Sequence, residues 1–279
     1  MVRTRRSIEE EARVRWLEEP CLDPLSAQGR VQEALIERVV QWGGTRGKRA
    51  LVVGLEDGGR IALGLLRKGL FVTVVDPSQE AIASLKEAAE KEKIGLGLNT
   101  FADSYMSRDF SISSFDLVVI YAALNHFSEP FVVVRKAKRE MKVGARFFGR
   151  INTRPEIPLD KLPLHKIPQR ITGIVGKVWE RLKATSVFSI YSQWPTAQMA
   201  LEGFKQEFSV EDVVLVNPLV VTTGVVTSKL GLSISRVEGL LSPLEERIPE
   251  PWRMRLGGSL GVFALKEREL GRTFKPGTR

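Results

Sequence analysis

"ALVVGLEDGGRIALGLLRKGLFVTVVDPS", residues 50–78, holds two short apolar runs separated by a glycine-bearing turn and an amphipathic segment. Both runs are rich in valine and leucine, which is typical of strands buried on both faces of a parallel sheet. The segment between them, residues 58–69, carries isoleucine and leucine at helical spacing. The order strand, turn, helix, strand predicts the first unit of a nucleotide-binding α/β sheet.

The rest of the chain continues this alternation of strand and helix patterns. Strands that alternate with helices form a parallel sheet covered on both faces. The sequence therefore predicts an α/β fold with a doubly wound, mostly parallel, seven-stranded sheet, whose ligand crevice lies at the carboxyl ends of the first strands. The expected helices cover residues 7–19, 26–42, 58–69, 78–93, 129–144 and 196–208, and the later strands cover 94–103, 114–124, 145–151, 210–221 and 259–267.

Composition sets the class of protein. The 279 residues are 43% hydrophobic, enough for a sizeable core, and no apolar run reaches the roughly 18 residues of a membrane span. The single cysteine, Cys21, excludes an intramolecular disulfide and leaves no cysteine pairs for zinc, so no metal site is expected. The first residues, "MVRTRRSIEEEARVRW", lack the apolar core of a signal peptide. We expect a soluble cytoplasmic protein.

The net charge of +9 has its source in one stretch of the chain. Residues 135–183 hold 14 basic and 4 acidic side chains, a net of +10. One interpretation is a solvated helix face that adds solubility. The other is a surface for an anionic partner, such as nucleic acid, a phosphorylated small molecule or a lipid head group.

The turn after the first strand contains two acids, Glu56 and Asp57. Gly54 stands where the backbone has to turn sharply and come close to a ligand, so a side chain there would block the site. The following helix points its amino end at the crevice, an end that ordinarily attracts anions. Two carboxylates at that point would repel a pyrophosphate. The turn therefore favours a cationic or phosphate-free ligand over a dinucleotide.

From residue 49 to 266 the chain resembles the class I S-adenosylmethionine-dependent methyltransferases. The segments that carry this resemblance are "ALVVGLEDGGRIALGLLRKG", "VTVVDPSQEAI", "FADSYM", "SFDLVVIYAALNHF", "EPFVVVRKAKREMKVGARFF" and "RLGGSLGVFALKE". They resemble the family's cofactor loop, second strand with its acid, adenine-side segment, fourth strand, fifth strand with the preceding helix, and final antiparallel strand. The specificity lies in their order and spacing.

The resemblance implies S-adenosylmethionine as cofactor and a set of binding residues. Gly54, Glu56 and Gly58 would form the cofactor loop. Asp76 would accept from both ribose hydroxyls, because a carboxylate offers two oxygens; a helix cap is the alternative.

Two further residues are expected near the cofactor. Asp103 would accept from the adenine amino group, or would simply form a turn before Ser104. Tyr121 would lie near the methyl group, or would be a packed, half-buried tyrosine.

Asn125 and His126 follow the fourth strand and are the expected catalytic residues. A histidine there could take the proton of the acceptor, since its pKa suits work near neutrality. The alternative is that His126 caps the next helix. The predicted reaction is methyl transfer to an oxygen, nitrogen or carbon of a small-molecule or RNA acceptor.

The loop also departs from the family pattern. Val52 stands where the family usually has an acid, and Glu56 stands at the second glycine position. These departures keep open a catalytically inactive methyltransferase-like module that contacts RNA or a protein partner. A nicotinamide-dependent oxidoreductase on a similar sheet is a second alternative, which the acidic turn disfavours.

The expected organisation is one sheet domain with additions. Its segments are an N-terminal helical cap (1–48), the cofactor-binding half of the sheet (49–151), a basic lid insertion (152–195), the C-terminal part of the sheet (196–267) and a tail (268–279).

Overall fold

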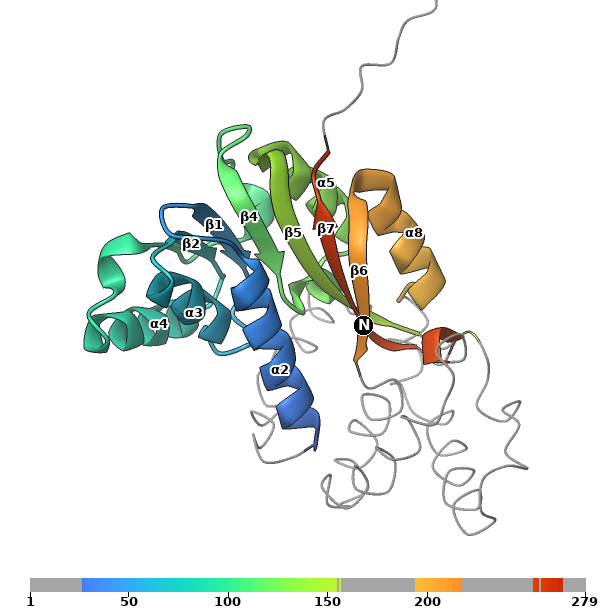
Figure 1. Cartoon of the computed structure of the whole chain (residues 1–279), viewed down its shortest axis with the longest axis horizontal. Coiled ribbons are helices and arrows are strands. Elements are labelled where there is room, and N and C mark those ends of the chain that lie inside the picture. The colour runs from blue at the N-terminus through green and yellow to red at the C-terminus, as the bar shows by residue number, and fades with distance from the viewer. Residues whose placement is uncertain (1–26, 155, 157–193, 217–252, 256, 268–279) are drawn as a thin grey trace, which may run out of the picture.

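The computed structural model describes residues 27–154, 156, 194–216, 253–255 and 257–267 (Figure 1). The α-helices are α2 (Ala27–Trp42), α3 (Arg60–Arg67), α4 (Gln79–Lys91), α5 (Pro130–Glu140) and α8 (Ala197–Glu207). The strands are β1 (Arg49–Val53), β2 (Phe71–Val75), β3 (Leu98–Phe101), β4 (Phe115–Ile120), β5 (Met141–Thr153), β6 (Ser209–Val216) and β7 (Gly258–Leu265). Three 3-10 turns complete the described elements: η1 (Gly95–Gly97), η2 (Tyr105–Ser107) and η3 (Ala123–His126).

The seven strands form one sheet in the order β3-β2-β1-β4-β5-β7-β6. All pairs from β3 to β5 are parallel, and β7 runs antiparallel between β5 and β6. The strand order reverses between β1 and β4, which are paired with Val53 opposite Ile120. In doubly wound sheets a ligand crevice forms at this switch point, outside the carboxyl ends of the strands. The predicted doubly wound, mostly parallel, seven-stranded sheet is confirmed.

Alternate side chains of the buried strands face two separate helix layers, as the period of a strand requires. Val52 belongs to the core under α2, α3 and α4, whereas its neighbours Leu51 and Val53 belong to the core under α5 and α8. Strands buried on both faces have no polar face to show, which explains their continuous apolar runs. Figure 1 shows the sheet between these two layers.

The region around 141 differs from the sequence expectation. The predicted helix 129–144 ends at Glu140, and β5 begins at Met141 instead of residue 145. Met141 already pairs with Phe115 on β4, and the register then shifts before Arg146 pairs with Leu117. Gly144, with φ +76, lies in this irregular stretch and does not end the helix. Pairing of β5 with β4 therefore overrides the helical pattern of the last turn.

Several predicted segments lie outside the described residues. These are the helix 7–19, most of the basic lid 152–195, the end of the strand 210–221 and the tail 268–279. The segment boundaries expected from the sequence therefore stay predictions. In the described part of the chain, no helix has the length and apolarity needed to cross a bilayer.

Candidate functional site at the carboxyl edge of the sheet

Gly54 makes the sharp turn at the end of β1. Its φ of +84 is a left-handed conformation that glycine adopts without strain. Its N–H donates to the Val75 carbonyl at 2.9 Å, which joins the ends of β1 and β2. A Cβ at this position would lie 2.7 Å from the Ala123 Cβ, after β4. Only a bare backbone lets the loops after β1 and β4 approach this closely.

Asp57 turns into the protein and holds the start of α3. Its carboxylate accepts from the Gly59 N–H at 3.0 Å and from the Ile61 N–H at 2.6 Å. Burial raises the pKa of Asp57 above its ordinary value, although these two hydrogen bonds act in the opposite direction. The carboxylate therefore satisfies backbone donors that the first turn of a helix leaves without partners. One of the two acids of the turn is structural.

Glu56 points the other way, toward the loop after β4. A Cβ on Gly54 would lie 2.2 Å from Glu56 Oε2, so the carboxylate covers this glycine. Its other oxygen, Oε1, is 3.3 Å from His126 Nε2. The two predicted residues from the loops after β1 and β4 thus meet above Gly54.

Asp76 ties the loops that follow β1 and β2. Its Oδ2 accepts from the Leu55 N–H at 2.9 Å, and its Oδ1 accepts from the Ser78 N–H at 2.7 Å. Each carboxylate oxygen has a second lone pair for a ligand. The helix cap considered as an alternative is made by Ser78, whose Oγ accepts from the Ala81 N–H at 3.2 Å.

Asp103 makes local contacts in the turn after β3. Its Oδ1 accepts from the Ser104 N–H and from the Ser107 Oγ, both at 2.9 Å. The side chain is 45% exposed and its Oδ2 lies 3.9 Å from Arg108. These contacts match the turn-forming alternative, and Oδ2 still faces away from the turn's own hydrogen bonds.

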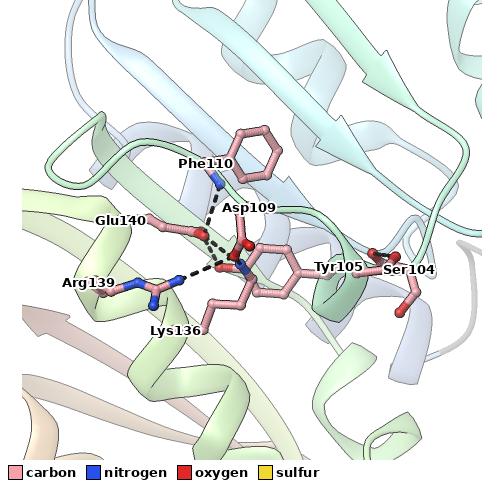
Figure 2. Close-up of polar contacts among 8 residues, drawn as sticks. Ser104, Tyr105, Asp109, Phe110, Lys136, Arg139 and Glu140 are labelled. Atoms are coloured by element: carbon pink, nitrogen blue, oxygen red, sulfur yellow. Dashed lines mark hydrogen bonds and ion pairs between the residues drawn. The ribbon is translucent and has the colours of Figure 1, made fainter.

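A buried polar cluster anchors this same turn to α5, as Figure 2 shows. Fully buried Glu140 accepts from the Tyr105 hydroxyl at 2.6 Å and from Lys136 Nζ at 2.7 Å. Lys136 also donates to Asp109 at 2.9 Å. Burial, together with the Glu140 charge, raises the pKa of the Tyr105 hydroxyl, so it donates as a neutral phenol. The sequence analysis missed this cluster, for which the helical i,i+4 spacing of Lys136 and Glu140 was the available signal.

Tyr121 is buried at the end of β4, beneath the same edge. Its hydroxyl accepts from Arg150 Nη1 at 2.8 Å, and Arg150 Nε donates to Ser259 Oγ at 2.6 Å. Burial raises the pKa of the Tyr121 hydroxyl, and the Arg150 charge only partly opposes this. Tyr121 is thus more buried than the half-buried position weighed as the alternative, and the sequence analysis did not single out its partner Arg150.

The side-chain amide of Asn125 binds backbone at both ends. Its Oδ1 accepts from the Asn152 N–H at 2.7 Å, and its Nδ2 donates to the Asn152 carbonyl at 3.1 Å. Both ends of the side chain therefore fasten the loop after β4 to β5.

The basic side chains on α5 and at the start of β5 are matched by local acids. Lys136 and Arg139 contact Asp109, and Lys142 contacts Asp116. Arg135 and Lys138 both face Glu207 on α8. These ion pairs support the solvated, ion-paired interpretation of the α5 face, and they give no support for an RNA or other anionic partner on that helix.

The structure therefore brings most of the predicted residues to one edge of the sheet. Gly54, Glu56, Asp76, Tyr121 and His126 lie at the carboxyl ends of β1, β2 and β4. Gly58, with φ +69, is exposed in the same loop, where an added Cβ would meet nothing within 4 Å. Asp103 follows β3 at the same edge. Asn125 follows β4 and hydrogen-bonds the backbone of Asn152 on β5.

Known proteins share this architecture. Residues 51–149 match the family described as "Methyltransferase domain". A search of curated protein sequences finds no match.

Several solved structures match this chain over most of their own length, at low sequence identity. The [4+2]-cyclase SpnF has 16% identity and a TM-score of 0.57, over 88% of this chain and 84% of its own. The N-methyltransferase NodS of Bradyrhizobium japonicum, solved with S-adenosyl-L-homocysteine, has 11% identity and a TM-score of 0.56, over 93% and 99%. Geranyl diphosphate C-methyltransferase of Streptomyces coelicolor has 13% identity and a TM-score of 0.54, over 92% and 97%. The chain therefore has the fold of the class I S-adenosylmethionine-dependent methyltransferases, and its residues 51–149 are similar to a methyltransferase domain.

Proposed function

We propose that the chain is an S-adenosylmethionine-dependent methyltransferase, with the cofactor held at the carboxyl ends of β1 and β2 and the acceptor beside β4 and β5. The observation that carries this proposal is the turn after β1. Gly54, at φ +84, brings the loops after β1 and β4 together inside the segment that matches the methyltransferase domain. Two of the similar structures, NodS and the geranyl diphosphate enzyme, were solved with S-adenosyl-L-homocysteine.

The residues of the edge fit this cofactor better than a dinucleotide. S-adenosylmethionine carries a sulfonium and an ammonium group and has no phosphate. Asp76 keeps a lone pair on each oxygen for the two ribose hydroxyls, while its existing bonds to Leu55 and Ser78 hold it still. Glu56 adds a second carboxylate at the point where a pyrophosphate would be repelled.

Glu56 also has to move for the site to open. Its carboxylate covers Gly54, the place where a ligand approaches the backbone. It is the far end of a flexible side chain, 29% exposed, and His126 contacts it from across the crevice. We expect Glu56 to exchange this contact for the ammonium group of the cofactor, a role that Val52 cannot supply from the position where the family usually has an acid.

Methyl transfer requires little of the protein beyond the correct placement of the cofactor and the acceptor. S-adenosylmethionine supplies an electrophilic methyl group, and its transfer needs the acceptor atom in line and close. Tyr121 and the packed ends of β4 and β5 would exclude water from this place. His126, once released from Glu56, would take the proton that the acceptor loses.

Isothermal titration calorimetry with S-adenosyl-L-homocysteine tests the proposal. Gly54→Ala should weaken binding by about tenfold or more, since its Cβ would intrude on both Glu56 and Ala123. Gly144→Ala is the matched control: its φ of +76 imposes similar strain, but an added Cβ meets nothing within 4 Å. Its binding should equal that of the wild-type protein.

Two results would contradict the proposal. The absence of heat at high micromolar ligand with the wild-type chain would favour an inactive methyltransferase-like module. Binding of NAD or NADP in place of S-adenosyl-L-homocysteine would favour an oxidoreductase.

A further inference from the structure

Arg150 is a buried cation that forms no ion pair with any acid among the described residues. It is 6% exposed, and its Nε and Nη1 donate to the hydroxyls of Ser259 and Tyr121 at 2.6 and 2.8 Å. No carboxylate of residues 27–154, 156, 194–216, 253–255 or 257–267 forms an ion pair with it. Lys136 and Lys142, on α5 and at the start of β5, each have such a partner.

Both partners of Arg150 are neutral. Serine does not ionise, and burial raises the pKa of the Tyr121 phenol, which therefore keeps its proton. A buried charge that nothing opposes is costly, and proteins ordinarily pair such groups. The hydroxyls of Ser259 and Tyr121 instead fix the orientation of the guanidinium, which carries five N–H donors in a planar fork. They take one donor from Nε and one from Nη1, which leaves three for another molecule.

The place of Arg150 in the sheet points to the acceptor. Gly149 pairs with Ile120, the last residue of β4, so Arg150 lies one step beyond, beside Tyr121. Ile120 in turn pairs with Val53, the residue before Gly54. Arg150 thus lies at the same carboxyl edge of the sheet as the turn after β1. Its strand, β5, is two strands away from β1, next to β4, where we expect the acceptor to bind.

We propose that Arg150 binds the acceptor through an oxyanion, so that the substrate is a small molecule with a carboxylate or phosphate group. The position of this acceptor rests on the proposed function, whereas anion binding by Arg150 does not. A planar fork suits the two oxygens of either group, and a charge-assisted bidentate contact is the stronger kind. Ser259 and Tyr121 act as positioning residues for the guanidinium.

The test measures the melting temperature of the full chain against two probes at constant ionic strength. One probe is inorganic pyrophosphate and the other is malonate, with sodium chloride as the balancing salt. Saturating a site with about ten times its Kd should raise the melting temperature by about 2 °C for a chain of this size. We expect one of the two probes to do so, and that probe identifies the charged group of the acceptor.

Three variants assign the response. Arg150→Met should abolish the shift, and Arg150→Lys should reduce it, since an ammonium lacks the fork. Arg146→Met is the matched control from the same strand, because its guanidinium donates to the Trp42 carbonyl and stacks on that ring. It should respond as the wild-type chain does. The inference fails if neither probe shifts the wild-type chain, or if Arg150→Met responds fully.

Calorimetry with S-adenosyl-L-homocysteine separates this inference from the proposed function. Arg150→Met should bind that ligand as the wild-type chain does, which also shows that the variant is folded. Cofactor binding without any anion response would remove the inference and leave the methyltransferase. An anion response without cofactor binding would support the Arg150 site and remove the methyltransferase. If Arg150→Met does not fold, the test rests on Arg150→Lys. A shift of its melting temperature by the anion equal to that of the wild-type chain would overturn the inference.

Discussion

Lys136 and Arg150 are both buried cations, at two ends of the same α5–β5 unit, and their surroundings differ. Lys136 has two carboxylates within 3 Å, those of Glu140 and Asp109. Arg150 has two hydroxyls. The first cation completes a network that holds the turn after β3 against a helix, so its charge is neutralised within the fold. The second lies at the edge where a ligand is expected, and its charge remains available.

The largest expected effect comes from exchanging each cation for methionine. Lys136→Met leaves the fully buried Glu140 without its cation, and breaking a buried ion pair costs about 3–5 kcal/mol. Arg150→Met removes a buried charge without stranding an acid, so it should cost less than about 1.5 kcal/mol. Denaturant unfolding of both variants measures the difference. Equal losses would show that Arg150 is as structural as Lys136.

A smaller effect is expected at the turn after β1, where the buried acid Asp57 accepts from backbone donors. Asp57→Asn keeps one acceptor oxygen and loses the other, at an expected cost of about 1–2 kcal/mol near the acid end of the pH range. Burial raises the pKa of Asp57 above its ordinary value of 3.8. A raised pKa of a carboxyl in the folded state means that its contribution to stability is present at low pH and is lost as pH rises through the raised pKa.

The difference between wild-type and Asp57→Asn stability should therefore shrink as pH increases above about 3.8 and level off once the raised pKa is passed. Ser78→Ala is the control, because it removes the neutral cap of α4. Its cost, about 1 kcal/mol, should be the same at every pH. A difference for Asp57→Asn that grows with pH would contradict the burial effect on its pKa.

The smallest effect is expected for an exposed cation with a single partner. Arg135 is 56% exposed and lies 3.8 Å from Glu207. Because exposed ion pairs contribute little, Arg135→Ala should change the free energy of unfolding by less than about 0.5 kcal/mol.

Gel-shift titration with RNA tests the same helix face for nucleic-acid binding. Charge reversal of Arg135, Lys138 and Arg139 should leave any weak binding of RNA nearly unchanged. A loss of binding that depends on salt would restore the nucleic-acid interpretation of the basic segment.

The order of elements and the gathering of the candidate residues at one edge of the sheet were predictable because they depend on local pattern. Apolar runs such as that of β1 mark strands buried on both faces, and Gly54 and Asp76 directly follow two of them. The opposite directions of Glu56 and Asp57 were not predictable, because adjacent residues in a turn face different sides only once the helix start is placed. Arg150 was also out of reach, because Ser259, its partner, is 109 residues away on a strand inserted between β5 and β6.

The most direct test is a crystal structure of the full chain with S-adenosyl-L-homocysteine. We predict the adenosyl group against the Gly54 turn, with its ribose hydroxyls on Asp76 and the Leu55 N–H bond to Asp76 retained. Glu56 should have left its place above Gly54 and should accept from the ligand's ammonium group. The account would be contradicted by a structure from crystals grown at saturating ligand that shows no ligand at this edge. In that structure Glu56 would still cover Gly54 and contact His126.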